Sequence, residues 1–179
     1  MRILGIVGSL RAGSHNRRLL AAAAAAAPFG VSIEVYERLG EIPPYNEDLD
    51  APEPVLAFRA AIADADAVLI ATPEYNASIP GVLKNALDWA SRPFPDNALR
   101  GKPTAVVGAS TGLFGAVWAQ AELRKVLATI GADVVDTELP VGQADQAFDE
   151  HGRLREPATQ AALVALLTEL GATGDRRIA

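Results

Sequence analysis

The sequence predicts an α/β fold in which a mostly parallel sheet is covered by helices on both faces. Apolar strand-like runs alternate with helix-like segments from one end of the chain to the other, which is typical of right-handed βαβ crossovers. The central run Ala67–Thr72 is almost entirely apolar and rich in β-branched residues, as a strand covered on both faces should be. A chain of 179 residues with this alternation fits a five-stranded doubly wound sheet of order 2-1-3-4-5.

Five strands and five helices are expected. The strands are expected at residues 3–7, 31–36, 67–72, 104–108 and 133–139, and the helices at 16–27, 54–65, 81–91, 115–130 and 157–170. The first helix is alanine-rich, and its small face can pack closely on the sheet. Pro80 suits the first turn of the third helix, where Leu83 and Leu87 fall on one face. Residues 39–54 and 142–157 are expected to be surface loops, and the segment 171–179 is expected to fray.

Composition and charge exclude several classes of function. With 22 acidic and 16 basic residues the formal charge is −6, and no dense Lys/Arg patch occurs, which argues against nucleic-acid binding. The chain has no cysteine, so disulfides, thiolate catalysis and Cys-ligated metal centres are excluded. We expect no metal site and no membrane span, because the longest apolar tract is too short to cross a bilayer. A single domain over residues 1–179 and a cytoplasmic location are expected, since the apolar run at the amino terminus is too short for a signal peptide.

A polar loop at residues 73–78 follows the central strand and precedes a helix. Open α/β sheets bind ligands in the crevice at the carboxyl ends of their strands. In the predicted topology the loops after strands one, three and four meet at this edge of the sheet. We therefore expect these three loops to share a ligand.

The first of these loops, residues 8–16, has the composition of an anion-binding site. Four donor side chains stand at or just before a helix amino terminus: Ser9, Arg11, Ser14 and Asn16. Backbone N–H groups and the helix dipole favour a phosphate there. Ser14 or Asn16 can equally cap the helix, and the loop alone does not decide between these roles. The patterns GxxxxGK(S/T) and GxGxxG are absent, which argues against ATP cleavage and dinucleotide binding at this loop.

The second and third loops suit a flat ligand. Backbone amides and Asn76 of the second loop can hydrogen-bond the polar edge of a planar heterocycle, with Tyr75 nearby. The third loop, residues 108–115, is rich in glycine and allows close backbone approach. Turn formation, helix capping and ordinary aromatic packing can each explain single residues here, but they explain poorly three such loops at one edge.

Three segments together resemble a known family. The first is Gly8-Ser9-Leu10-Arg11 with Ser14 and Asn16. The second and most specific is Pro73-Glu74-Tyr75-Asn76 with Ser78, Pro80-Gly81, Leu83-Lys84-Asn85, Asp88-Trp89 and Ser91-Arg92. The third is Gly108-Ala109-Ser110 with Gly112, Gly115, Gln120, Leu123 and Arg124. In these segments the chain resembles the NADPH-dependent FMN reductase family of flavodoxin-like proteins, which includes quinone, chromate and azo-dye reductases.

The resemblance implies a flavodoxin-like three-layer sandwich that binds FMN. It implies that the phosphate is held by Ser9, Arg11, Ser14 and Asn16. It implies that the isoalloxazine is lined by Pro73, Glu74, Tyr75 and Asn76, and closed on the other side by Ser110 and Gly112. Lys84, Asn85 and Asp88 are expected to be structural or interfacial, and a homodimer or homotetramer is expected.

The activity implied by the resemblance is that of an NAD(P)H-dependent FMN reductase or quinone reductase. NADPH or NADH would be a transient co-substrate, and a small-molecule electron acceptor, such as a quinone, free flavin, chromate or an azo compound, would follow it in a ping-pong cycle. Because the flavin supplies the redox chemistry, no catalytic acid or base is expected in the chain. His15 and His151 are accordingly not expected to be catalysts.

Trp118 departs from the family pattern, which often has an arginine at this point. It would either replace a charge by a stacking surface or pack in the core or an interface, and the packing role is favoured. Preference for an anionic acceptor such as chromate is therefore in doubt. Two alternatives to an enzyme are a non-catalytic flavodoxin-like electron carrier or flavin-binding protein, and an FMN-free protein that binds another anion. Arg11 and the moderate net charge argue against the carrier.

Overall fold

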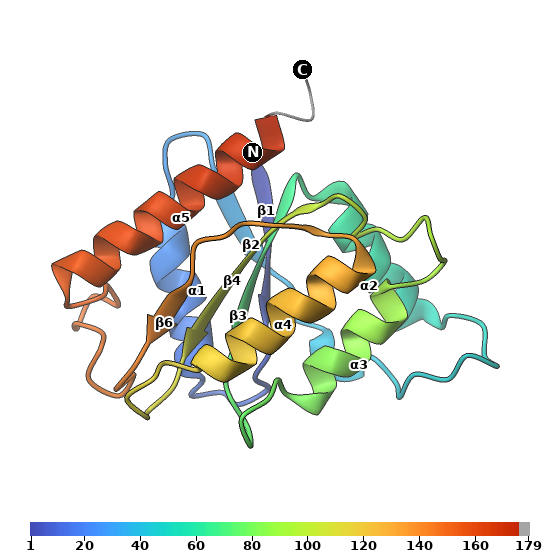
Figure 1. The fold of residues 1–179 in the computed structure, drawn as a ribbon, viewed down its shortest axis with the longest axis horizontal. Coiled ribbons are helices and arrows are strands. Elements are labelled where there is room, and N and C mark those ends of the chain that lie inside the picture. The colour runs from blue at the N-terminus through green and yellow to red at the C-terminus, as the bar shows by residue number, and fades with distance from the viewer. Residues whose placement is uncertain (176–179) are drawn as a thin grey trace.

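The computed structural model describes residues 1–175 of the chain, which form a three-layer α/β sandwich around a parallel sheet (Figure 1). The strands of this sheet are β1 (Arg2–Val7), β2 (Ser32–Val35), β3 (Ala67–Thr72), β4 (Pro103–Ala109), β5 (Asp133–Val134) and β6 (Leu139–Val141). They are parallel in the order β2-β1-β3-β4-β5, with β6 also paired to β4. The predicted order of the sheet is confirmed.

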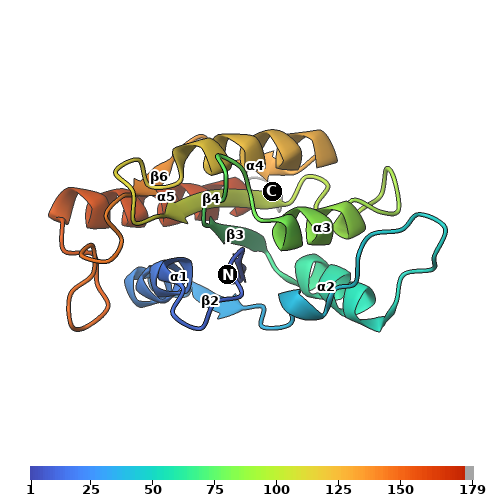
Figure 2. The same cartoon turned by 90° about the horizontal axis from the view of Figure 1, so that it is seen from below.

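Helices cover both faces of the sheet, as the alternation of the sequence predicts. They are α1 (His15–Ala26), α2 (Glu53–Asp64), α3 (Gly81–Ala90), α4 (Val117–Ile130) and α5 (Pro157–Asp175). Figures 1 and 2 show α1 and α5 on one face and α2, α3 and α4 on the other. Among the described residues, no helix is both long enough and apolar enough to cross a membrane.

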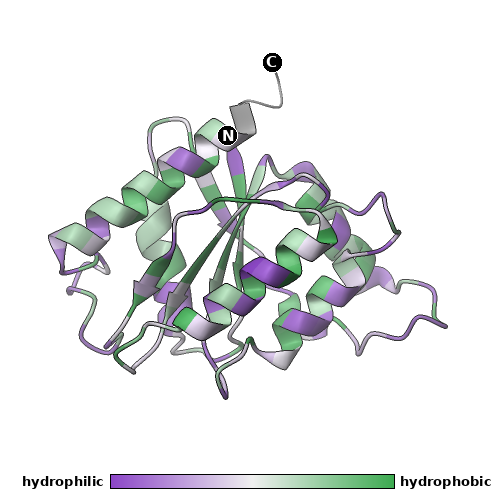
Figure 3. Ribbon diagram, viewed as in Figure 1, coloured by the Kyte–Doolittle hydropathy of each residue, from purple (hydrophilic) through white to green (hydrophobic). Residues whose placement is uncertain are grey.

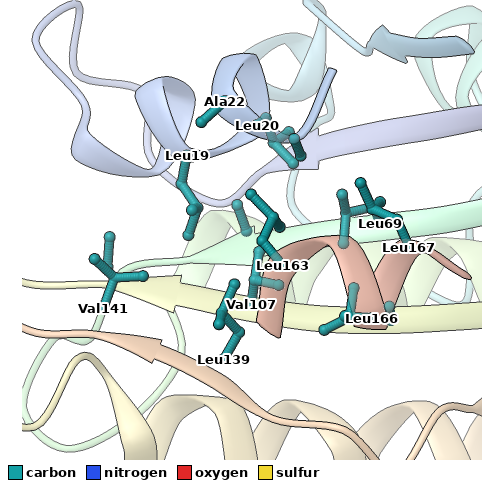
Figure 4. Close-up of a cluster of buried hydrophobic side chains, with 14 of the residues drawn as sticks. Leu19, Leu20, Ala22, Leu69, Val107, Leu139, Val141, Leu163, Leu166 and Leu167 are labelled. Atoms are coloured by element: carbon teal, nitrogen blue, oxygen red, sulfur yellow. The ribbon is translucent and has the colours of Figure 1, made fainter. Parts of the chain in front are cut away.

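Strand periodicity divides the core into two clusters, one on each face of the sheet. In β1, Ile3 and Val7 join the cluster under α1 and α5, while Leu4 and Ile6 join the cluster under α2, α3 and α4. Figure 4 shows the first cluster, in which leucines of α1 and α5 meet side chains of β3, β4 and β6. Figure 3 shows the strands as apolar and the loops as mostly hydrophilic.

The predicted fifth strand, residues 133–139, is wrong as a continuous element. It is divided into β5 and β6, because Arg124 donates from Nη1 to the carbonyl of Val135 at 2.5 Å and from Nη2 to that of Asp136 at 3.2 Å. The chain leaves the sheet at this point and rejoins it alongside Val107–Ala109. The strand therefore ends at Val141, and residues 142–144 lie at the carboxyl edge of the sheet.

Two other expectations also need correction. The segment from residue 171 does not fray at once, because α5 continues to Asp175, with Thr173 buried and its hydroxyl donating to the carbonyl of Glu169 at 3.0 Å. Residues 176–179 lie outside the described residues. The loop 39–54 includes the short 3-10 helix Leu39–Glu41 and is held on α3.

The residues of α3 that hold this loop belong to the second of the three family-like segments, the one that begins at Pro73. Asn85 accepts the backbone N–H of Tyr45 at 2.7 Å and donates to the carbonyl of Pro43 at 2.9 Å. Trp89 donates from Nε1 to the same carbonyl at 2.9 Å, and its ring packs edge-on against Tyr45. Asn85 therefore has a structural role, one of the two roles expected for it.

Candidate flavin site

The loops after β1, β3 and β4 lie at one edge of the sheet, the edge that faces the viewer in Figure 2. The first two loops are in contact, since a Cβ at Gly8 would lie 3.2 Å from Pro73 Cδ. The first and third are joined by Asn16, whose side-chain amide donates to the carbonyl of Ala109 and accepts from its N–H, both at 2.9 Å. The sheet thus brings the three predicted loops together.

Ser14 caps α1, as one of the sequence-based alternatives proposes. Its hydroxyl oxygen accepts from the backbone N–H of Arg17 at 3.3 Å, so its own O–H is left to donate to a ligand. Ser9 is buried, and its hydroxyl accepts from the N–H of Arg11 at a long 3.4 Å. The two serines therefore line the first loop while helping to shape it.

The amino terminus of α1 has a surplus of donors. Within the described residues, no hydrogen bond is recorded for the backbone N–H of Ala12, Gly13, His15 or Asn16, and His15 Nδ1 is buried without a partner. The first turn of α1 contains no acidic residue to neutralise the helix dipole. This end of the helix therefore suits an anion.

Arg11 is the cation most available to such an anion. It is exposed, and among residues 1–175 no hydrogen bond or ion pair is recorded for its guanidinium. Arg17 is held by both carboxylate oxygens of Glu37, and the guanidinium of Arg18 lies 4.6 Å from the ring centroid of Phe148. The hydrogen bond from Arg17 lowers the pKa of Glu37 and raises that of Arg17, so this pair is charged at neutral pH.

The second loop is a tight hairpin that projects from the end of β3. Tyr75 and Ser78 exchange backbone hydrogen bonds at 3.0 and 3.1 Å, and the two residues between them, Asn76 and Ala77, have φ of 55° and 59°. Positive φ at both central positions is the geometry of a type I′ turn. Tyr75 and Asn76 are thereby exposed at the edge, while Pro73 is buried beneath them.

Glu74 faces α4. Its Oε2 atom accepts from the backbone N–H groups of Trp118 and Ala119 at 3.0 and 3.1 Å. The N-cap position of α4 is Ala116, which has no side chain able to cap, so Glu74 takes this role from another loop. The family resemblance predicted that Glu74 lines the isoalloxazine as an acceptor. No residue pattern indicated that it caps α4.

The third loop rests on a fourth that the sequence did not predict to lie at this edge. Ser110 donates from its N–H to the carbonyl of Val141 at 3.1 Å, and the carbonyl of Gly112 accepts from Gln143 at 2.9 Å. A Cβ at Gly142 would lie 2.3 Å from the carbonyl oxygen of Leu113, so only glycine fits there. In the sequence, the apolar residues Leu139 and Val141 could have indicated this loop, because they mark the true end of the strand.

A family model described as NADPH-dependent FMN reductase matches residues 1–146 of the chain. The chain belongs to the NADPH-dependent FMN reductase family. This confirms the expectation of a flavodoxin-like oxidoreductase with FMN as cofactor and NAD(P)H as co-substrate.

Similar proteins agree with this family over most of the chain. The NAD(P)H-dependent FMN reductase of Pseudomonas aeruginosa is 49% identical over 158 residues, which are 86% of this chain and 84% of that protein. The 2-hydroxy-1,4-benzoquinone reductase of a Burkholderia species is 40% identical and covers 99% of both chains. Among solved structures, the flavoenzyme NAD(P)H:(acceptor) oxidoreductase FerB from Paracoccus denitrificans superposes with a TM-score of 0.86 at 36% identity, covering 98% of this chain and 97% of that one.

The donor set at the crevice fits FMN. The free N–H groups and serine hydroxyls of the first loop are donors of the kind that binds a phosphate. The third loop also keeps donors free, because within the described residues no bond is recorded for the N–H of Thr111, Gly112 or Leu113. Such donors suit the polar edge of an isoalloxazine.

Proposed function

We propose that this member of the family transfers two electrons from NAD(P)H through bound FMN to small quinones. The observation that supports this most is the surplus of free backbone N–H donors at the start of α1, facing the glycine-rich third loop across the switch point of the sheet. Relatives named quinone reductase or 2-hydroxy-1,4-benzoquinone reductase support the choice of acceptor.

The first loop would hold the phosphate. Ser9 and Ser14 would donate their hydroxyls, and Arg11 would offset part of the charge. Asn16 would act mainly by fixing the loop to Ala109, since both ends of its amide are already engaged there.

The other loops would hold the ring system. Pro73, Tyr75 and Asn76 would lie along one side of the isoalloxazine, with Glu74 fixing this loop to α4. Ser110 and Gly112 would close the other side, where free backbone donors can stabilise negative charge on the ring.

FMN when bound would supply the redox chemistry, so that NAD(P)H, a proton and a quinone give NAD(P)⁺ and a hydroquinone. The chain's own contribution is to bind and orient, and no side chain is needed as acid or base. We propose that both substrates use the same open face in turn, which is a ping-pong order.

The test is a titration of purified protein with FMN, followed by anaerobic reduction with NADH and NADPH and reoxidation by a panel of acceptors. Quinones, free flavin, chromate and an azo dye belong in this panel. We expect the protein to bind FMN, the bound flavin to be reduced by either NADH or NADPH, and the reduced flavin to be reoxidised by 1,4-benzoquinone. Failure to take up FMN would overturn the proposal, and bound FMN without NAD(P)H oxidation would indicate the electron carrier instead.

We further propose a homo-oligomer built on α3 and α4, in a cytoplasmic location where NAD(P)H is available. A groove of about 450 Å³ between these helices has an apolar floor that includes Val126 and Ile130. Its rim holds both charge signs, with Lys84 and Asp88 on α3 and Glu122 and Lys125 on α4, which suits a second copy related by a two-fold axis. Sedimentation velocity would show a monomer if this is wrong.

A further inference from the structure

Two exposed aromatic rings lie at the start of α4, beside the proposed flavin site. Phe114 is 62% exposed and Trp118 is 51% exposed, although both are large and apolar. Their ring centroids are 5.2 Å apart at an interplanar angle of 67°, an edge-to-face arrangement that leaves ring surface of both available. Exposed apolar surface next to a binding site indicates contact with a ligand or partner.

The position of the two rings is fixed relative to the flavin loops. Glu74, which directly precedes Tyr75, accepts the backbone N–H of Trp118 at 3.0 Å. Phe114 follows Gly112 in the third loop, and its carbonyl accepts from Val117 at 3.2 Å in the turn that leads into α4. The pair therefore continues the wall formed by the second and third loops.

This part of the rim is electrically neutral. Residues 109–121 include no charged side chain, and the charged residues that flank the pair are acidic: Glu74, which is engaged with α4, and Glu122, which is exposed. The nearest arginine along α4, Arg124, is directed to the carbonyls of Val135 and Asp136 and lies 3.8 Å from Glu138. Residues 109–121 therefore offer an anion no cation, whereas a flat uncharged ring would gain a stacking surface.

We propose that Phe114 and Trp118 form an acceptor platform that selects flat, uncharged quinones over anionic acceptors. This rests on the proposed function, because the platform acts in the half-reaction in which the acceptor is reduced. The net reaction is the same for an uncharged and for a sulfonated quinone: NAD(P)H, a proton and the quinone give NAD(P)⁺ and the hydroquinone.

The test compares two acceptors with the same ring system, 1,4-naphthoquinone and 1,4-naphthoquinone-2-sulfonate, on FMN-loaded protein. We expect kcat/KM of the wild type to favour the uncharged quinone. Trp118→Ala should lower kcat/KM for this quinone about two- to tenfold, the range for loss of an aromatic contact. Trp118→Arg should shift the ratio between the two quinones by about tenfold toward the sulfonate. Phe29→Arg is the matched control, since Phe29 is fully exposed in the turn between α1 and β2, at the opposite edge of the sheet.

Equilibrium dialysis of each quinone against oxidised, FMN-loaded protein without NAD(P)H gives a readout that does not depend on turnover. The same ordering of affinities is expected. If wild type, Trp118→Ala and Trp118→Arg discriminate equally between the two quinones, the proposal is overturned. If Trp118→Arg lowers the sedimentation coefficient and affects both quinones alike, the pair is a subunit contact, which also overturns it. A wild type that binds FMN but oxidises no NAD(P)H would overturn the proposed function, while dialysis would still decide the platform.

Discussion

The carboxylate of Glu74 accepts a hydrogen bond from the backbone N–H of Trp118 at 3.0 Å. This contact joins the loop after β3 to the first turn of α4, whose N-cap residue, Ala116, has φ of 62° and no capping side chain. A carboxylate at the start of a helix satisfies free N–H groups and opposes the positive end of the dipole. Glu74 therefore caps the helix and positions the loop after β3 with the same group.

Glu74→Ala should destabilise the protein by about 1 kcal/mol, the usual effect of removing a helix cap. Glu74→Gln should recover part of this loss, because an amide oxygen still accepts the N–H groups but has no charge. Urea denaturation of both variants measures the difference. Equal stability of Glu74→Ala and wild type would show that the contact contributes nothing to folding.

Ala77→Gly should stabilise the hairpin. Ala77 has φ of 59°, a left-handed conformation that is unfavourable for a residue with a Cβ by roughly 1–2 kcal/mol, whereas glycine adopts it freely. The higher entropy of glycine in the unfolded chain offsets part of this gain, so we expect an increase of up to about 1 kcal/mol. Thermal or urea unfolding checks the sign.

Ala121→Gly is the control for this substitution. Ala121 lies exposed within α4, where glycine should destabilise by about 1 kcal/mol. Opposite signs for the two alanine-to-glycine changes would confirm the strain at Ala77. A loss of stability in both would refute it.

The fold and the meeting of the three loops at one edge of the sheet were predictable, since both depend on local pattern. The buried run of β3 and the polar residues after it mark the carboxyl edge of the sheet, where the candidate site lies. The role of Glu74 was not predictable, because its partner Trp118 lies 44 positions along the chain and is bound through the backbone, which no side-chain pattern reveals. The fifth strand was misplaced because Arg124 binds the carbonyl of Val135. That tertiary contact interrupts a run that has strand character.

Asn16→Ala should destabilise the protein strongly. Asn16 is buried and satisfies both the N–H and the carbonyl of Ala109, so its loss leaves two backbone groups unpaired, at roughly 1–3 kcal/mol each. Urea denaturation without added FMN isolates this effect. A variant as stable as wild type but with weak FMN binding would instead make Asn16 a direct ligand.

Glu37→Gln should lower stability at neutral pH but not in acid. The hydrogen bond from Arg17 lowers the pKa of Glu37 below its ordinary value of 4.5. The stabilisation is therefore fully present above that value and is lost as the pH falls through the lower pKa of the folded state. Because the pair is exposed, the effect at pH 7 should be only about 0.2–1 kcal/mol and should shrink in salt. Urea midpoints of both proteins should converge below pH 4.5, and a constant difference would contradict this account.

Arg11→Ala should weaken FMN binding about 10- to 100-fold, the range expected for a hydrogen bond to a charged group. The FMN affinity of Arg11→Lys should lie between those of Arg11→Ala and wild type, because lysine keeps the charge but lacks the planar fork of donors. Fluorescence titration of apoprotein with FMN measures the affinity, and stopped-flow reduction at saturating FMN should show little change in rate. Arg100→Ala is the control, since it removes the same charge just before β4, at the opposite edge of the sheet. Equal FMN affinity of Arg11→Ala and Arg100→Ala would refute the role of Arg11 as the phosphate's cation.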